Sequence, residues 1–197
     1  MNKNFKRAAF ATALAAAAVL TLTACVMPFN MGGNNPMGGD GDQNASDIMF
    51  VEMMIPHHEQ AVEMSETILA KGGVDPEVVA LAEQIRAAQE PEIALMEQWL
   101  DDWGLPSMSG MGGMDHGGSG GQGGMMSDAQ MSELEEADGA TGSTLFLELM
   151  IDHHDGAIEM AEDVIDDGRD ADVRTLAEQI IVSQTAEIAT MRELLSR

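Results

Sequence analysis

The chain has 197 residues, enough for one domain of ordinary size, and its formal net charge of −25 is strongly acidic. Such a charge repels nucleic acid and anionic lipid headgroups and attracts cations, although acidic residues also simply keep a protein soluble. The sequence holds neither a Ser/His/Asp set, a phosphate-binding glycine loop nor a basic patch, so it gives no support to a hydrolase, nucleotide-binding or nucleic-acid-binding role.

Residues 1–24 are typical of a lipoprotein signal peptide. Basic residues precede an apolar run over residues 8–20, and Leu22-Thr23-Ala24-Cys25 then forms a lipobox. The run is shorter than the ~20 residues that the alternative, a transmembrane helix, would need. We therefore expect cleavage before Cys25, lipid on its sulfur, and an exported protein anchored at the extracytoplasmic face of a bacterial membrane.

The first helical hairpin is predicted over residues 47–103. Residues 25–46 are rich in Gly, Asn, Pro and Met and predict a flexible tether. From Asp47 onward, apolar residues recur at three- and four-residue spacing along one helix face. Two glycines after Lys71 end this helix, and Asp75 caps a second helix that runs to about residue 103.

A linker and a second hairpin follow. Residues 104–127 contain ten glycines and five methionines, and this composition carries too much backbone entropy for a packed element. Residues 128–197 predict a short helix, to about residue 137, and then a return of the first pattern after residues 139–143.

The second hairpin is an internal repeat of the first. A shift of 96 residues matches nine of the fifteen residues in 50–64, and a shift of 95 matches ten of the seventeen in 80–96. Two hairpins that each carry one apolar face must bury those faces against each other. We therefore predict an all-α, ferritin-like four-helix bundle with a disordered, Gly/Met-rich crossover.

Each half carries the motifs H-H-x-x-A-x-x-M and Q-x-x-E-I-x-x-M. At about 100° per residue, His57 falls at the centre of the apolar face and His58 at its edge. Counting from the hairpin turn places His57 level with Gln89, and Met53 and Met54 level with Glu92. The candidate core ligands are Met53, Met54, His57, His58, Glu92, Met96, Met150, His153, His154, Glu187 and Met191, supported by Gln89 and Gln184.

Two interpretations of this polar set stay open. Buried polar groups need partners, so a His57-Gln89-Glu92 hydrogen-bond network could fix the register of the bundle and bind nothing. Alternatively, imidazole and thioether together suit a soft ion, and copper as Cu(I) is our first candidate, with Ag(I) as a chemical mimic. The linker holds a second candidate metal site, formed by Met108, Met111, Met114 and His116. The alternative is that these residues are an inert part of the linker.

The sequence resembles the bacterial family called domain of unknown function 305 (DUF305). The resemblance rests on residues 54–58 with Ala61 and Met64, on the downstream Q-x-x-E-I-x-x-M, and on their second copies, over about residues 47–196. It implies a ferritin-like bundle and exported copper-binding proteins of the CopM type among its relatives. The second half departs from the first at two positions. Ser143 is the equivalent of Asp47, so a contact at the helix start is expected in the first half only. Asp152 is the equivalent of Pro56, so a kink is likewise expected only in the first half.

Three functions compete. The first is a non-enzymatic copper-binding protein that sequesters or delivers the metal outside the cytoplasm. The second is a metal-dependent oxidoreductase, but neither half has the Glu-x-x-His spacing of di-iron bundles. The third is an interaction module whose polar core is structural. We therefore expect a metal-binding protein that is not an enzyme, and its protein partner is unknown.

We expect Cys25→Ser to release the protein from membranes or to block its processing, because the lipid is joined to that sulfur. Fractionation of cells, with the size of the product read on a gel, measures both. A mature-sized Cys25→Ser product that stays with the membranes would show that the anchor lies elsewhere.

Overall fold

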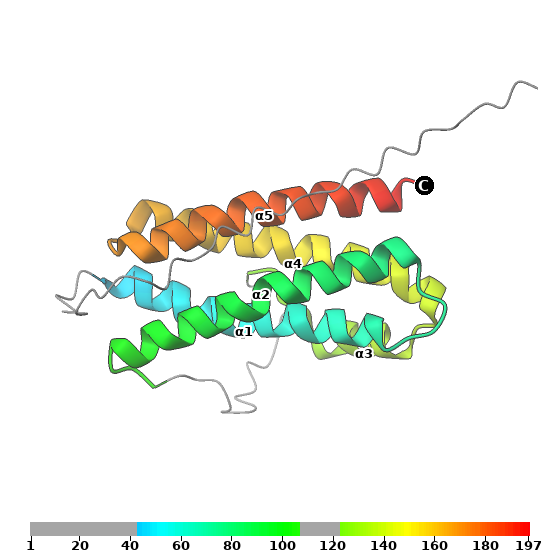
Figure 1. The fold of residues 1–197 in the computed structure, drawn as a ribbon, viewed down its shortest axis with the longest axis horizontal. Coiled ribbons are helices and arrows are strands. Elements are labelled where there is room, and N and C mark those ends of the chain that lie inside the picture. Colours follow the sequence, from blue (N-terminus) through cyan, green and yellow to red (C-terminus); the bar gives the residue numbers. More distant parts are fainter. Residues whose placement is uncertain (1–42, 107–122) are drawn as a thin grey trace, which may run out of the picture. The chain divides into compact units, whose positions relative to one another are not determined.

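The structure is a computed structural model and describes residues 43–106 and 123–197. These residues form five helices and no strand, and the predicted all-α class is confirmed. In chain order the helices are α1 (Ala45–Leu69), α2 (Pro76–Asp102), α3 (Asp128–Glu136), α4 (Gly139–Asp167) and α5 (Ala171–Leu195) (Figure 1). None of these five helices combines the length and the apolar character that a membrane span requires. The predicted signal peptide, Cys25 and most of the tether lie outside the described residues.

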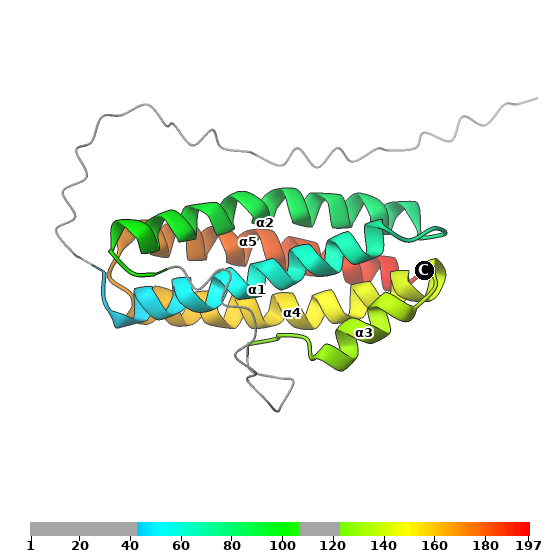
Figure 2. The ribbon, with the colours of Figure 1, turned by 90° about the horizontal axis from the view of Figure 1, so that it is seen from below.

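The four long helices form the bundle of two hairpins. α1 packs against α2, α4 packs against α5, and the hairpins meet chiefly through α1 and α4. The short α3 lies against α1 and α4 (Figure 2). The predicted bundle of two duplicated hairpins is therefore confirmed.

Local sequence sets the helix starts. Asn44 caps α1 with its side chain, Asp75 caps α2 immediately before Pro76, and Asp138 caps α4. Because of the Asp138 cap, α4 begins at residue 139, earlier than the apolar pattern indicates. α1 runs as one unbroken helix through Pro56, whose ring lies on the exposed side.

The apolar core is divided into two clusters, one toward each end of the bundle. The cluster at the turn of the first hairpin includes Met64, Ile68, Ile85, Phe146, Met150 and Met191. The cluster at the turn of the second hairpin includes Phe50, Met54, Met96, Leu100, Val164 and Ile180. Each cluster takes side chains from all four long helices, so neither hairpin has a complete core of its own.

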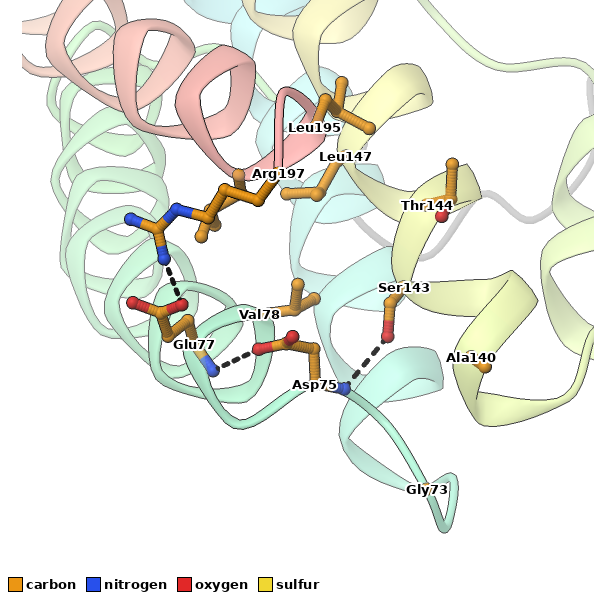
Figure 3. A pocket seen from close by; sticks show the side chains of 11 residues that line it. Gly73, Asp75, Glu77, Val78, Ala140, Ser143, Thr144, Leu147, Leu195 and Arg197 are labelled. Carbon is orange, nitrogen blue, oxygen red and sulfur yellow. Dashed lines mark hydrogen bonds and ion pairs between the residues drawn. The ribbon is translucent and has the colours of Figure 1, made fainter.

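The start of each hairpin is bonded to the turn of the other. The carboxylate of Asp47, fully buried, accepts hydrogen bonds from the backbone N–H groups of Asn44, Arg169 and Asp170 at 2.7 to 3.2 Å. In the second half, the hydroxyl of Ser143 accepts one bond of 3.0 Å from the N–H of Asp75 (Figure 3). The helix-start contact that was expected to be missing from the second half is therefore present, with one bond in place of three.

We expect Asp47→Ala to lower the free energy of unfolding by ~3 kcal/mol, since three N–H groups lose their acceptor at about 1 kcal/mol each. Ser143→Ala, the matched change in the second half, should cost about 1 kcal/mol. Urea denaturation of both variants gives the comparison. Equal losses of unfolding free energy in the two variants would show that the number of hydrogen bonds does not determine how much each position stabilises the fold.

Candidate metal centre

A layer of polar side chains crosses the middle of the bundle between the two apolar clusters. His57 and His58 on α1 and His153 and His154 on α4 are at most 1% exposed. Gln89 and Gln184 belong to the same layer and are 2% exposed. The helical pattern placed His57 at the centre of the apolar face and His58 at its edge, and in the structure the edge positions are buried as well.

His57 and His153, equivalent residues of the two repeats, are in direct contact. Their ring centroids are 3.7 Å apart and the ring planes are inclined by 37°. The contact arises because each residue occupies the centre of its helix face and α1 packs against α4. The internal repeat thus brings two imidazoles together at the junction of its halves.

Both rings of this pair are neutral at physiological pH. Burial, helped by the neighbouring His58, lowers the pKa of His57 to about 3 against the opposing bond to Gly123. Burial, followed by the nearby His57, lowers the pKa of His153 well below its usual value of 6.5. A neutral imidazole keeps one nitrogen lone pair, which is the form that binds metals.

The tautomer of His57 follows from its hydrogen bond. Nε2 of His57 lies 2.7 Å from the carbonyl oxygen of Gly123. A carbonyl oxygen only accepts, so Nε2 carries the hydrogen and donates it. Nδ1 therefore keeps the lone pair, and it has no hydrogen-bond partner among the described residues. Neither nitrogen of His153 meets the geometry of a hydrogen bond to a described residue, although the backbone of His57 lies close enough to oppose the lowering of its pKa.

The second histidine of each pair is held by a glutamate of its own hairpin. Nε2 of His58 lies 2.8 Å from Glu92, and Nε2 of His154 lies 2.8 Å from Glu187. These carboxylates accept from the rings and fix their orientation, while the Nδ1 atoms lack partners within the described ranges. Glu187 also accepts from Gln84 on α2 at 3.3 Å, so its environment differs from that of Glu92.

The hydrogen-bond pairing differs from the predicted His57-Gln89-Glu92 network. Glu92 bonds His58, and Gln89 is buried with neither amide atom bonded to a described residue. Counting residues from the turn gave the level of each side chain along the axis but not its direction around the helix. His57 faces α4, whereas His58, at the edge of the face, is turned toward α2.

The predicted methionines separate into buried and exposed groups. Met54 and Met96 are fully buried in one apolar cluster, and Met150 and Met191 are fully buried in the other. Met53 is 46% exposed and is not brought into the core. The four predicted linker ligands at positions 108, 111, 114 and 116 lie outside the described residues.

Residues 123–126, placed in the linker by sequence, pack onto this layer. Gln60 binds both backbone groups of Met126, which is 8% exposed and joins the first core cluster. The sequence signal was weak: Gln60 and Gly156 are equivalent positions at which the repeat is broken. The glycine-rich composition predicted a flexible linker here, whereas residues 123–126 are held by contacts with residues far away in the sequence.

The donor set restricts what the layer can bind. Among the described residues, no three His, Cys, Asp or Glu side chains are arranged to hold one metal ion. A metal in the layer would therefore be held by fewer than three of these groups, and thioether sulfur beside imidazole nitrogen is a combination that favours soft ions. The hollow drawn in Figure 3, between Gly73, Val78, Leu147 and Arg197, lies at the first hairpin turn and contains none of the histidines.

Comparison with known proteins gives one family and several solved structures. The model of the family described as Domain of unknown function (DUF305) matches residues 47–195. A DUF305 fragment from Deinococcus radiodurans is 31% identical, with a TM-score of 0.68 over 79% of this chain and 98% of that one. A DUF305 protein from Streptomyces coelicolor is 35% identical, with a TM-score of 0.66 over 77% and 91%.

The protein CopM has the same fold. Its Cu(I)-bound form is 30% identical to this chain, with a TM-score of 0.62 over 76% of this chain and 95% of CopM. CopM structures also exist in Cu(II)-bound and Ag-bound forms. No curated protein matches the chain.

We expect the metal-free protein to lose stability as the pH falls below 6.5. His57 and His153 then become protonated in the unfolded chain but stay neutral in the native state. In the native state burial lowers the pKa of His57 to about 3 and that of His153 well below 6.5. The free energy of unfolding should fall by about 2 kcal/mol between pH 7 and pH 5 on account of His57, and the His153 contribution has the same sign. A variant with both residues changed to Gln keeps every carboxylate and should lose this part of the dependence. Identical pH profiles would show that the two rings are not held neutral.

Proposed function

This chain belongs to the DUF305 family, and we propose that it binds copper, first as Cu(I), at the buried histidine layer. We further propose that it does so outside the cytoplasm, attached through Cys25, and that it sequesters or passes on the metal without catalysing a reaction. The predicted signal peptide and lipobox support the location.

The observation that carries the proposal is the set of buried imidazole nitrogens without partners. Eight polar atoms of the layer, including Nδ1 of all four histidines, have no hydrogen-bond partner among the described residues. Buried polar atoms are ordinarily bonded, and a purely structural network would satisfy them. A metal ion bound by the lone pairs would supply the missing interaction for several of these atoms.

Soft ligands surround this set. His57 and His153 would supply nitrogen, and the buried thioethers of Met54, Met96, Met150 and Met191 flank the layer on both sides. Neutral imidazole and thioether together suit Cu(I) and Ag(I). The CopM structures with Cu(I), with Cu(II) and with Ag support a copper site, and the choice of Cu(I) rests on the ligand chemistry.

The glutamates have a supporting role in this proposal. Glu92 and Glu187 hold His58 and His154 by bonds of 2.8 Å, which orient the rings. Met53 is exposed and is not part of the core ligand set. The linker residues 108, 111, 114 and 116 form a second, weaker site in the proposal, because a flexible segment loses more conformational entropy on binding.

We expect the double change His57→Ala, His153→Ala to abolish tight Cu(I) binding. The test uses a background in which the four linker ligands are serine, so that only the core site is measured. Anaerobic titration against a competing chelator gives the affinity. In the parent background, melting should shift upward by the equivalent of ~2.7 kcal/mol at a hundredfold excess over Kd, and the double variant should not shift.

Met53→Ala in the same background is the matched control. It removes an exposed side chain one turn before His57, so binding should be unchanged. Equal Cu(I) affinity in the double variant and its parent would place the metal outside the histidine layer, and loss of binding in Met53→Ala would place it on the surface of α1.

A further inference from the structure

A short segment of the chain closes one side of the histidine pair. Residues 123–126, which we call the strap, lie across α1 and α4 before α3 begins. The carbonyl of Gly123 accepts the bond from Nε2 of His57. Gln60, almost one turn further along α1, holds the other end of the strap by donating to the carbonyl of Met126 at 2.9 Å and accepting from its N–H at 2.7 Å.

The strap lies so close to α4 that a side chain cannot fit between them. A Cβ on Gly156 would lie 2.1 Å from the carbonyl oxygen of Gly123, a separation that real Cβ atoms do not reach. A Cβ on Gly124 would lie 2.5 Å from the carbonyl oxygen of Asp152, and Gly124 has a φ of +75°. The strap therefore rests backbone to backbone on α4, and only glycine permits this at both contacts.

The strap uses a position at which the repeat has diverged. Gln60 and Gly156 correspond under the 96-residue shift that also relates His57 to His153. In the first half the position supplies a side chain that binds the strap. In the second half it supplies the space into which the strap fits. One strap thus contacts both halves in different ways.

We propose that the strap is a positioning element that holds His57 as its Nε2–H tautomer and leaves Nδ1 as the metal-binding nitrogen. The proposal rests on the proposed copper function for the last step, but the tautomer itself is a property of the metal-free protein. Gln60 and Gly156 act through the Gly123 carbonyl and do not touch the metal. Hydrogen-bond partners of this kind fix ring orientation and tautomer in metal sites, and their loss costs roughly 10- to 100-fold in affinity.

The alternative role for the strap is to fill space. Met126 is buried in the first core cluster, so a displaced strap would also open the core. A space-filling role affects stability alone. A positioning role also affects which nitrogen of His57 carries the hydrogen.

Two strap variants and one control test the proposal in the full mature chain. Gly156→Ala prevents the strap from seating, and Gln60→Leu removes both bonds to Met126 without adding bulk to α4. Gly142→Ala is the control, because its Cβ would meet only movable side-chain atoms, the nearest being Cδ1 of Ile68 at 3.2 Å. Histidine ring ¹⁵N NMR of the metal-free protein reports the tautomer, and anaerobic titration with Cu(I) reports the affinity.

We expect the wild type and Gly142→Ala to show the Nε2–H tautomer at His57. Both strap variants should show a mixture of tautomers, with Cu(I) affinity lower by about 10- to 100-fold. If they lose stability but keep the tautomer and the affinity, the strap only fills space and the proposal is overturned. If the wild type binds no Cu(I) but the tautomer changes in the strap variants, the strap positions His57 and the copper function fails instead.

Discussion

The contact between His57 and His153 is the constraint around which this bundle is built. Two neutral imidazoles lie 3.7 Å apart at the junction of the halves, where a wholly apolar bundle would place aliphatic side chains. Their presence divides the core into two clusters, each assembled from both hairpins. Polar atoms held in such a layer cost stability unless something binds them, so the layer links the packing of the protein to its ligand.

The sequence predicted the fold because its signals were periodic and repeated. Apolar spacing, caps and the two copies of His-His and Gln-x-x-Glu specified helices, hairpins and the buried histidines. They placed His57 at the centre of its face and His58 at the edge but did not show which neighbouring side chain each one meets. The predicted network therefore joined Glu92 to His57, and exposed Met53 was included among the core ligands. The strap at residues 123–126 could not be predicted from composition, since its place depends on Gln60 and Gly156.

The two halves differ in the contacts that they make where they meet. Asp47 accepts three backbone bonds and Ser143 accepts one, Glu187 is more buried than Glu92, and the strap bonds His57 but not His153. Each difference lies in a contact around the central layer or at a hairpin turn. The two equivalent histidines of this duplicated fold therefore lie in different surroundings.

The exchange of contacts between helix starts and turns has a consequence for how the halves recognise each other. The first half binds the turn of the second, and the second binds the turn of the first, which is the reciprocity of an isologous dimer. Each hairpin therefore carries its own part of the contacts that set the geometry of the interface. The peptide connection raises the effective concentration of one hairpin near the other. The bundle therefore resembles a homodimer whose two subunits are joined in a single chain.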